Sequence, residues 1–155
     1  MKTQDYHSSI TTSVDPEKTL QSISRVSEWW TSHFEGQSQN PGDEFTVHFG
    51  KTFVTFTVTE VVAGKKVSWL VTDCNLEWLS DKKEWNGTRV VWEVSARNGV
   101  TQVDFTHQGL VPAVECYEAC EKGWNFFIKY SFFKLITEGK GLPDAPGEVR
   151  EKVMA

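Results

Sequence analysis

Acid–base chemistry is the first function that the residue types suggest, and its candidates are His107 and Tyr117. His107 continues the alternation of Val103 and Phe105, so its imidazole should point inward at the end of a strand. Tyr117 follows Pro112 on the inward face of a predicted helix. An imidazole kept neutral by burial and a nearby phenol could exchange protons with a bound molecule. The structural alternative is that each side chain only bonds its own neighbours.

Thiol and metal chemistry are weaker interpretations. Cys116 and Cys120 lie one helical turn apart, where a disulfide would constrain nothing, and Cys74 is remote from both in sequence. A nucleophilic thiol needs a base, for which His107 is the only candidate, so small apolar helix residues are the simpler explanation. The four histidines are scattered, without CxxC or HExxH spacing, and we therefore expect no metal and no cofactor.

Aromatic side chains are the most unusual feature of the composition, with seven Trp and ten Phe beside only two Met. At inward positions they would either fill the core or form a flat apolar clamp for a ring-bearing or acyl ligand. A Trp pair after the first short helix would lie over one end of such a cavity. The predicted ligand-binding set is Trp29, Trp30, His33, Phe56, Trp69, Trp92, His107, Tyr117, Cys120, Trp124 and Phe127.

One long helix, predicted over residues 112–138, has to position many of these side chains. Pro112 suits its first turn, Gly139 suits the left-handed position after its end, and Pro143 prevents it from resuming. At ~1.5 Å per residue it would span roughly 40 Å and must therefore lie across something broad. Its inward stripe on a helical wheel is Ala113, Tyr117, Cys120, Trp124, Phe127, Ile128, Ser131 and Leu135.

A curved antiparallel sheet is the natural partner of this helix. Period-two alternation predicts six strands, near residues 6–14, 45–49, 52–62, 67–71, 90–94 and 103–107. Asp15 and Pro16 predict the start of a short helix after the first strand, and a second short turn follows at Glu28-Trp29-Trp30. The sequence thus predicts an α+β domain in which six strands curl around one helix and leave a cavity between them.

A second aromatic stripe, Phe126, Tyr130 and Phe133, lies on the opposite side of the predicted helix. It is either covered by the short helices or the C-terminal segment, or exposed as a surface for a protein partner or a weak homodimer. We expect one domain over residues 1–143 and a polar, poorly ordered tail over 144–155.

Charge and hydropathy exclude several partners. The net charge of −5 gives no electrostatic reason to bind nucleic acid. No apolar run approaches the ~18 residues of a membrane span. Residues 1–5 lack the apolar region of a signal peptide, which favours a cytoplasmic location.

Several short motifs, taken together in their order, resemble the START-like (SRPBCC) superfamily, and within it the Hsp90 ATPase activator homologue-like family of small bacterial domains. The resemblance extends from about Tyr6 to Gly141. It implies a helix-grip fold, in which a curved sheet wraps a long C-terminal helix around a hydrophobic tunnel. The motifs are Glu28-Trp29-Trp30, Gly87-Thr88-x-Val90-x-Trp92, Phe105-Thr106-His107-x-Gly109 and Gly123-Trp124.

Three functions are consistent with this resemblance, whose superfamily includes lipid and hormone carriers, polyketide cyclases and aromatases. The leading hypothesis is a soluble protein that binds a small hydrophobic or aromatic molecule between sheet and helix. The second is a cyclase or hydrolase that uses His107 and Tyr117 in the same cavity. The third is a chaperone-associated or other protein-interaction domain. We favour binding over catalysis because the inward set contains few polar groups.

Overall fold

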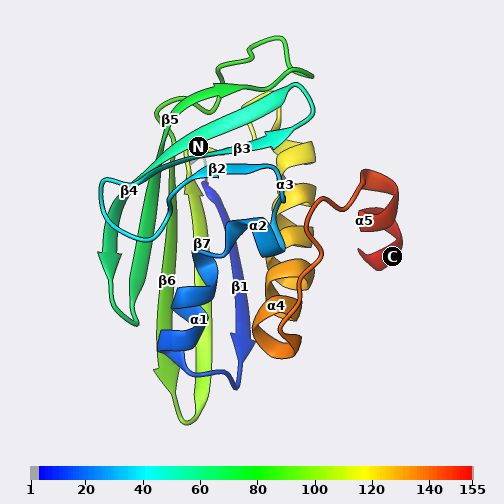
Figure 1. The fold of residues 1–155 in the computed structure, drawn as a ribbon. Coiled ribbons are helices and arrows are strands. Elements are labelled where there is room, and N and C mark those ends of the chain that lie inside the picture. Colours follow the sequence, from blue (N-terminus) through cyan, green and yellow to red (C-terminus); the bar gives the residue numbers. More distant parts are fainter. Residues whose placement is uncertain (1–3, 155) are drawn as a thin grey trace.

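The computed structural model describes residues 4–154 and shows a curved sheet with helices packed along its concave side (Figure 1). Within these residues the sheet has seven antiparallel strands in the order β1-β7-β6-β5-β4-β3-β2. The strands are β1 (Tyr6–Thr12), β2 (Phe34–Gly36), β3 (Glu44–Phe49), β4 (Thr52–Val62), β5 (Lys66–Asn75), β6 (Arg89–Arg97) and β7 (Val100–Gln108).

The predicted count of six strands was one short. The missed strand is β2, an edge strand of three residues that pairs only with β3, placing Phe34 opposite Val47. Three residues are too few to show a period of two, so the alternation that revealed the other strands could not reveal this one. The α+β architecture and the antiparallel arrangement were predicted correctly.

Two local features give the sheet its shape. The pairing of β4 with β5 shifts register between Thr55 and Phe56 and again between Val58 and Glu60, and such bulges bend a sheet. The β6–β7 hairpin turns at Asn98 and Gly99, both with positive φ (52° and 78°), as the primed hairpin turns require.

The short helices differ from the prediction in detail. Helix α1 (Pro16–Ile23) begins as expected, because the Asp15 carboxylate accepts a 2.9 Å hydrogen bond from the Lys18 amide. Helix α2 (Val26–Trp29) is a single turn that starts earlier than expected and ends before Trp30. Trp29 and Trp30 stack with ring centroids 5.8 Å apart, and both are buried.

The long helix is divided into α3 (Tyr117–Phe126), a π-helical segment η1 (Phe127–Phe132) and α4 (Phe133–Glu138). It begins at Tyr117 and not at Pro112, because residues before it form turns and the Glu84 carboxylate accepts hydrogen bonds from the Glu115 and Cys116 amides (3.1 and 3.0 Å). A carboxylate suits this position because a helix N-terminus is electropositive. Gly139 ends the helix in the left-handed region as predicted (φ 84°).

The π-helical segment explains why the helix buries more residues than an ideal wheel allows. The Phe133 amide bonds to the Ile128 carbonyl, an i→i+5 contact that inserts one extra residue into the turn. Phe132 and Ile136, which the straight wheel places off the inward stripe, are consequently buried. A regular helical period cannot predict such an insertion.

The second aromatic stripe is mostly covered. Phe126 is completely buried, Phe133 is half-buried, and Tyr130 is 37% exposed. Tyr130 stacks on Phe126 with ring centroids 6.1 Å apart. The surface available to a protein partner at this stripe is therefore much smaller than three aromatic rings.

The C-terminal segment returns to the helices. Asp144 accepts hydrogen bonds from the Thr31 hydroxyl (2.8 Å) and the Ser32 amide (3.0 Å), and its own amide bonds to the Trp30 carbonyl. These contacts attach the segment that leads to helix α5 (Gly147–Met154), which lies beside α3 (Figure 1). A helix therefore occupies most of the stretch that composition predicted to be a polar tail.

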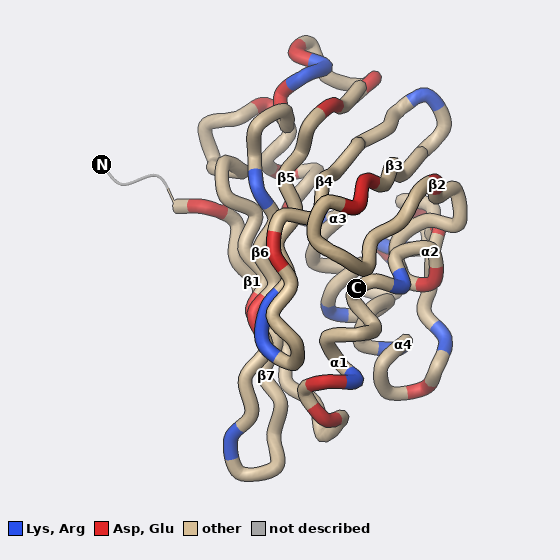
Figure 2. The backbone as a smooth tube through the Cα atoms, turned by 60° about the vertical axis from the view of Figure 1, so that its left-hand side comes forward, with Lys and Arg blue, Asp and Glu red and all other residues tan. Residues whose placement is uncertain are grey.

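Charged residues of both signs are interspersed along the loops and strands (Figure 2). None of the helices between residues 4 and 154 is long and apolar enough to cross a membrane.

The buried Ser131 hydroxyl provides a test of this arrangement. It donates to the Trp29 carbonyl (2.6 Å) and accepts from the Leu142 amide (2.7 Å), so it joins η1 to α2 and to the C-terminal segment. Ser131→Ala should lower the free energy of unfolding by about 1–3 kcal/mol in urea titration, because both partners lose their hydrogen bond. Thr137→Ala, which removes an exposed hydroxyl from the same helix, should change it by less than about 0.5 kcal/mol. Equal losses in the two variants would contradict this role.

Candidate functional site

Aromatic rings fill the space beneath the middle of the long helix. Trp92 is completely buried, and its ring centroid lies 5.5 Å from that of Trp29, 4.8 Å from Phe105 and 5.3 Å from Phe132. Trp69 adjoins the same cluster at 6.0 Å from Trp92. The hydrophobic tunnel implied by the resemblance is therefore closed here by the protein's own side chains.

A cavity of about 310 Å³ remains at one end of the helix, and we call it the end cavity. Its walls come from α3, from the facing end of the β3–β4 hairpin and from the loop that joins β5 to β6. The aromatic part of its lining consists of Trp30, Phe49, Trp78, Trp85, Trp124 and Phe127. Trp78 is 53% exposed, which places it at the mouth.

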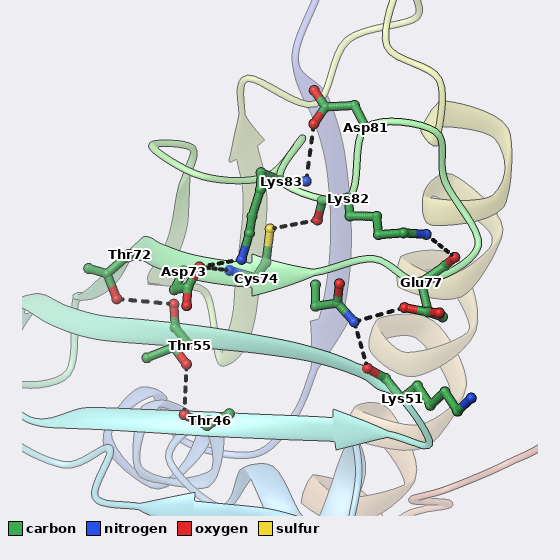
Figure 3. A network of polar contacts seen from close by, with 11 residues as sticks. Thr46, Lys51, Thr55, Thr72, Asp73, Cys74, Glu77, Asp81, Lys82 and Lys83 are labelled. Carbon is green, nitrogen blue, oxygen red and sulfur yellow. Dashed lines mark hydrogen bonds and ion pairs between the residues drawn. The ribbon is translucent and has the colours of Figure 1, made fainter.

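The β5–β6 loop supplies Leu76, Trp78 and Trp85 to the cavity wall, and a network of polar contacts holds it in place (Figure 3). The Lys82 ammonium donates to the Glu77 carbonyl at 2.7 Å, and the Lys82 carbonyl accepts from the Cys74 thiol at 3.5 Å. These bonds fold the loop back on the end of β5. The protein's own contacts therefore hold this part of the wall in place.

An ion pair fastens the far side of this loop. The Lys83 ammonium lies 2.9 Å from the Asp73 carboxylate, and the Lys83 amide bonds to Asp81. The hydrogen bond from Lys83 lowers the pKa of Asp73. Because both charged side chains are exposed, we assign the pair a positioning role and little stability.

Trp85 joins the loop to the helix. Its ring stacks on Trp124 at 6.0 Å with an interplanar angle of 11°, and its edge meets His107 at 4.6 Å. Its indole nitrogen donates to the Cys116 sulfur at 3.2 Å. Both stacked indoles line the end cavity.

His107 is completely buried, and both of its ring nitrogens have partners. The Trp124 indole N–H donates to Nδ1 at 3.1 Å, so Nδ1 must be unprotonated and Nε2 carries the hydrogen. Nε2 then donates to the Thr88 hydroxyl at 2.9 Å, which in turn donates to the Trp85 carbonyl at 2.6 Å. Burial lowers the pKa of His107 to about 3, and the imidazole is neutral at physiological pH.

Tyr117 does not complete an acid–base pair with His107. It is half-buried, it does not line the end cavity, and both His107 nitrogens bond to other side chains. Burial, followed by the neighbouring Glu121 carboxylate, raises the pKa of Tyr117. Proton exchange with a bound molecule would require these bonds to break first.

The cysteines are also poor nucleophiles. Cys120 lines the end cavity, but the adjacent Cys116 thiol and then burial raise its pKa far above the ordinary value. A thiol in such surroundings remains protonated and acts as a small apolar side chain. Cys116 is completely buried and accepts the Trp85 hydrogen bond.

The structure separates the predicted ligand-binding residues into three groups. Those in the wall of the end cavity are Trp30, Cys120, Trp124 and Phe127. Those in the buried core away from it are Trp29, Phe56, Trp69, Trp92 and His107. His33 is exposed and Tyr117 half-buried, and both lie outside the cavity lining.

Sequence reasoning missed Trp78, Trp85 and Arg150 as members of the wall. The two tryptophans stand in a long polar connection, where their only signal is that a loop rarely carries large apolar rings without burying them. Arg150 stands in the segment that was predicted to be a tail, and nothing in its sequence neighbourhood indicates a contact with α3.

Comparison with known proteins finds this architecture among solved structures. No family model matches the chain, and no curated protein matches it. Among solved structures, the Aha1 dimer from Colwellia psychrerythraea has a TM-score of 0.73 at 23% identity, covering 89% of this chain and 99% of that one. MLL2253 from Mesorhizobium loti has a TM-score of 0.65 at 16% identity, covering 88% of this chain and 100% of that one.

The chain has the START-like (SRPBCC) fold. DynU16, a protein of the dynemicin biosynthetic locus, shares this fold with a TM-score of 0.67 at 14% identity. The match covers 87% of this chain but only 48% of DynU16, so the chain spans about half the length of that protein. At these identities the likeness establishes the START-like architecture and leaves the function to the geometry of the site.

The neutral state of His107 predicts a pH dependence of stability. A histidine in the unfolded chain titrates near about 6.5, whereas the folded pKa is about 3. Between these values the unfolded chain binds more protons, so this contribution is complete above about pH 6.5 and is lost as the pH falls toward 3, by up to about 1.4 kcal/mol per pH unit. Urea titrations of the wild type at pH 7, 6 and 5 should show this decrease.

The matched comparison is between His107→Gln and His33→Gln, which change a buried and an exposed histidine. The first variant should lose this part of the pH dependence, and the second should retain it. A wild-type slope that persists in His107→Gln would show that another group carries it.

Proposed function

We propose that this protein binds a small apolar or aromatic molecule in the end cavity. The observation that carries the proposal is the aromatic lining of a cavity of about 310 Å³, in which Trp30, Trp85 and Trp124 lie at the surface of an otherwise filled core. This volume lies at the lower end of the ~300–1,000 Å³ typical of ligand pockets. Proteins with the START-like fold typically bind hydrophobic ligands, which supports the same function.

Burial energetics favour a planar ligand. A ring placed between Trp30, Phe127 and the stacked indoles would remove apolar surface from water. Each Å² of apolar surface buried in this way contributes about 25 cal/mol to the free energy of binding. It would also gain the additional offset-stacking energy of aromatic pairs, about 0.5–1.5 kcal/mol each. Apart from Arg150, the wall offers few free hydrogen-bonding groups, because the Thr52 hydroxyl accepts from the Glu77 amide and the Trp124 and Trp85 nitrogens donate to His107 and Cys116.

Catalysis is the less favoured alternative. A cyclase or hydrolase needs at least one proton-transferring group that can reach a substrate atom. His107 has both nitrogens engaged beneath Trp85 and Trp124, and Cys120 has a raised pKa. We therefore assign the cavity to binding.

Native mass spectrometry of gently purified protein, together with tryptophan-fluorescence titration, tests the proposal. A panel of flat aromatics and fatty acids should include members that quench or shift the emission, because four of the seven tryptophans line the end cavity. Retention of a bound mass in the spectrometer would support it. No bound mass and no fluorescence change across the panel would contradict it.

Ala119→Trp provides a direct test of the location. Ala119 is exposed at the edge of the end cavity, and an indole there would occupy the space that a ligand needs. Affinity for any panel member that binds the wild type should fall by about tenfold or more. Ala113→Trp adds the same side chain at an exposed position outside the lining and should leave affinity within about twofold. Unchanged binding by Ala119→Trp would place the ligand elsewhere.

Self-association is a second candidate, favoured by one observation: the Colwellia psychrerythraea protein with this fold is described as a dimer. On this chain the surface for it would include Tyr130, since Phe126 is buried. Sedimentation of the wild type and Tyr130→Glu should then show a dimer that the substitution dissociates. A wild type that stays monomeric at high concentration would contradict self-association. A chaperone-associated role would need an exposed surface other than this stripe.

A further inference from the structure

Arg150 is a cation set into the apolar wall of the end cavity. It extends from α5 across α3, and its guanidinium lies over the Phe127 ring at 5.7 Å from the centroid. Guanidinium groups favour aromatic faces, but this contact leaves the N–H donors without acceptors. The side chain is therefore held in place by packing and not by charge pairing.

Arg150 packs against a glycine of helix α3. Gly123 lies inside α3, where glycine costs about 1 kcal/mol relative to alanine. A Cβ atom on Gly123 would lie 3.4 Å from Nη1 of Arg150, so the guanidinium packs directly against this glycine. Gly123 also lines the end cavity.

The Arg150 side chain lacks a hydrogen-bond acceptor at its buried Nε and an ion-pair partner among residues 4–154. Burial lowers its pKa, with only the adjacent Glu151 acting in the opposite direction. An arginine stays charged in proteins, and this half-buried guanidinium has no carboxylate partner among residues 4–154.

We propose that the end cavity binds an aromatic or short acyl acid, whose apolar part packs against the tryptophans and whose carboxylate binds the Arg150 guanidinium. This inference rests on the proposed binding function and adds the charge of the ligand to it. A carboxylate matches the planar guanidinium fork and can accept hydrogen bonds from its Nη1 and Nη2 groups. The acid would thus contact both parts of the wall, the tryptophan rings and the cation beside them.

Two probes of nearly equal size separate charge from shape: naphthoate, which is ionised at pH 7, and naphthamide, which is not. Isothermal titration calorimetry of the wild-type protein should show naphthoate binding about tenfold more tightly than naphthamide, as expected for one charge-assisted pair. The same preference should diminish with added salt, because part of it is Coulombic.

Arg150→Gln removes the charge and leaves a shorter, neutral polar side chain. It should weaken naphthoate about tenfold and leave naphthamide within about twofold of the wild type. Lys152→Gln is the matched control, since it removes an exposed charge from the same helix outside the cavity lining. This control should change both affinities by less than about twofold.

Each result decides between the inference and the function on which it rests. Equal affinity of the wild type for both probes would overturn the inference and leave the binding function standing. Equal weakening of both probes by Arg150→Gln would also overturn it, by showing that Arg150 acts only as part of the wall. An effect of Lys152→Gln as large as that of Arg150→Gln would overturn the inference, because it would show that the positively charged side chains of α5 attract naphthoate without a specific contact to Arg150. Failure of the wild type to bind either probe would count against the inference and the cavity function together.

Discussion

The hydrogen bond from the Trp124 indole to His107 determines what lies between helix and sheet. It fixes the helix against β7, it requires a neutral imidazole, and it turns the Trp124 ring toward Trp85. On one side of this bond the rings around Trp92 close the interior, and on the other side the end cavity remains. A charged His107 would present a second N–H to the indole and disrupt both regions together.

This division explains why only a short cavity remains between the helix and the sheet. A START-like sheet wraps one helix and encloses more space than that helix fills. Large rings such as Trp69 and Trp92 occupy the middle of that space, and each is buried completely. Their indole nitrogens have no hydrogen-bond partner in the protein, a cost that bulky apolar packing offsets. What remains is the end cavity of about 310 Å³.

The sequence was informative where local chemistry decides structure and silent where tertiary contacts decide it. Period-two alternation, the Asp15 cap and Gly139 correctly predicted six of the strands, the first short helix and the end of the long one. Strand β2, the π-helical turn and helix α5 depend on pairing, on packing and on Asp144 contacts, which have no periodic signal. For the site, the aromatic excess predicted a cavity wall, yet alternation could not distinguish rings that fill the core from rings that line the cavity.

The central claim is that a ligand meets the tryptophans of the end cavity and not those of the closed core. Indole ¹H–¹⁵N correlation spectra of the chain, assigned by single Trp→Phe variants, test this directly during titration with naphthoate. The account predicts shifts for Trp30, Trp78, Trp85 and Trp124, with Trp69 and Trp92 unmoved. Shifts of Trp69 and Trp92 without those of the cavity wall would contradict it, because the ligand would then occupy the space that the rings are said to fill.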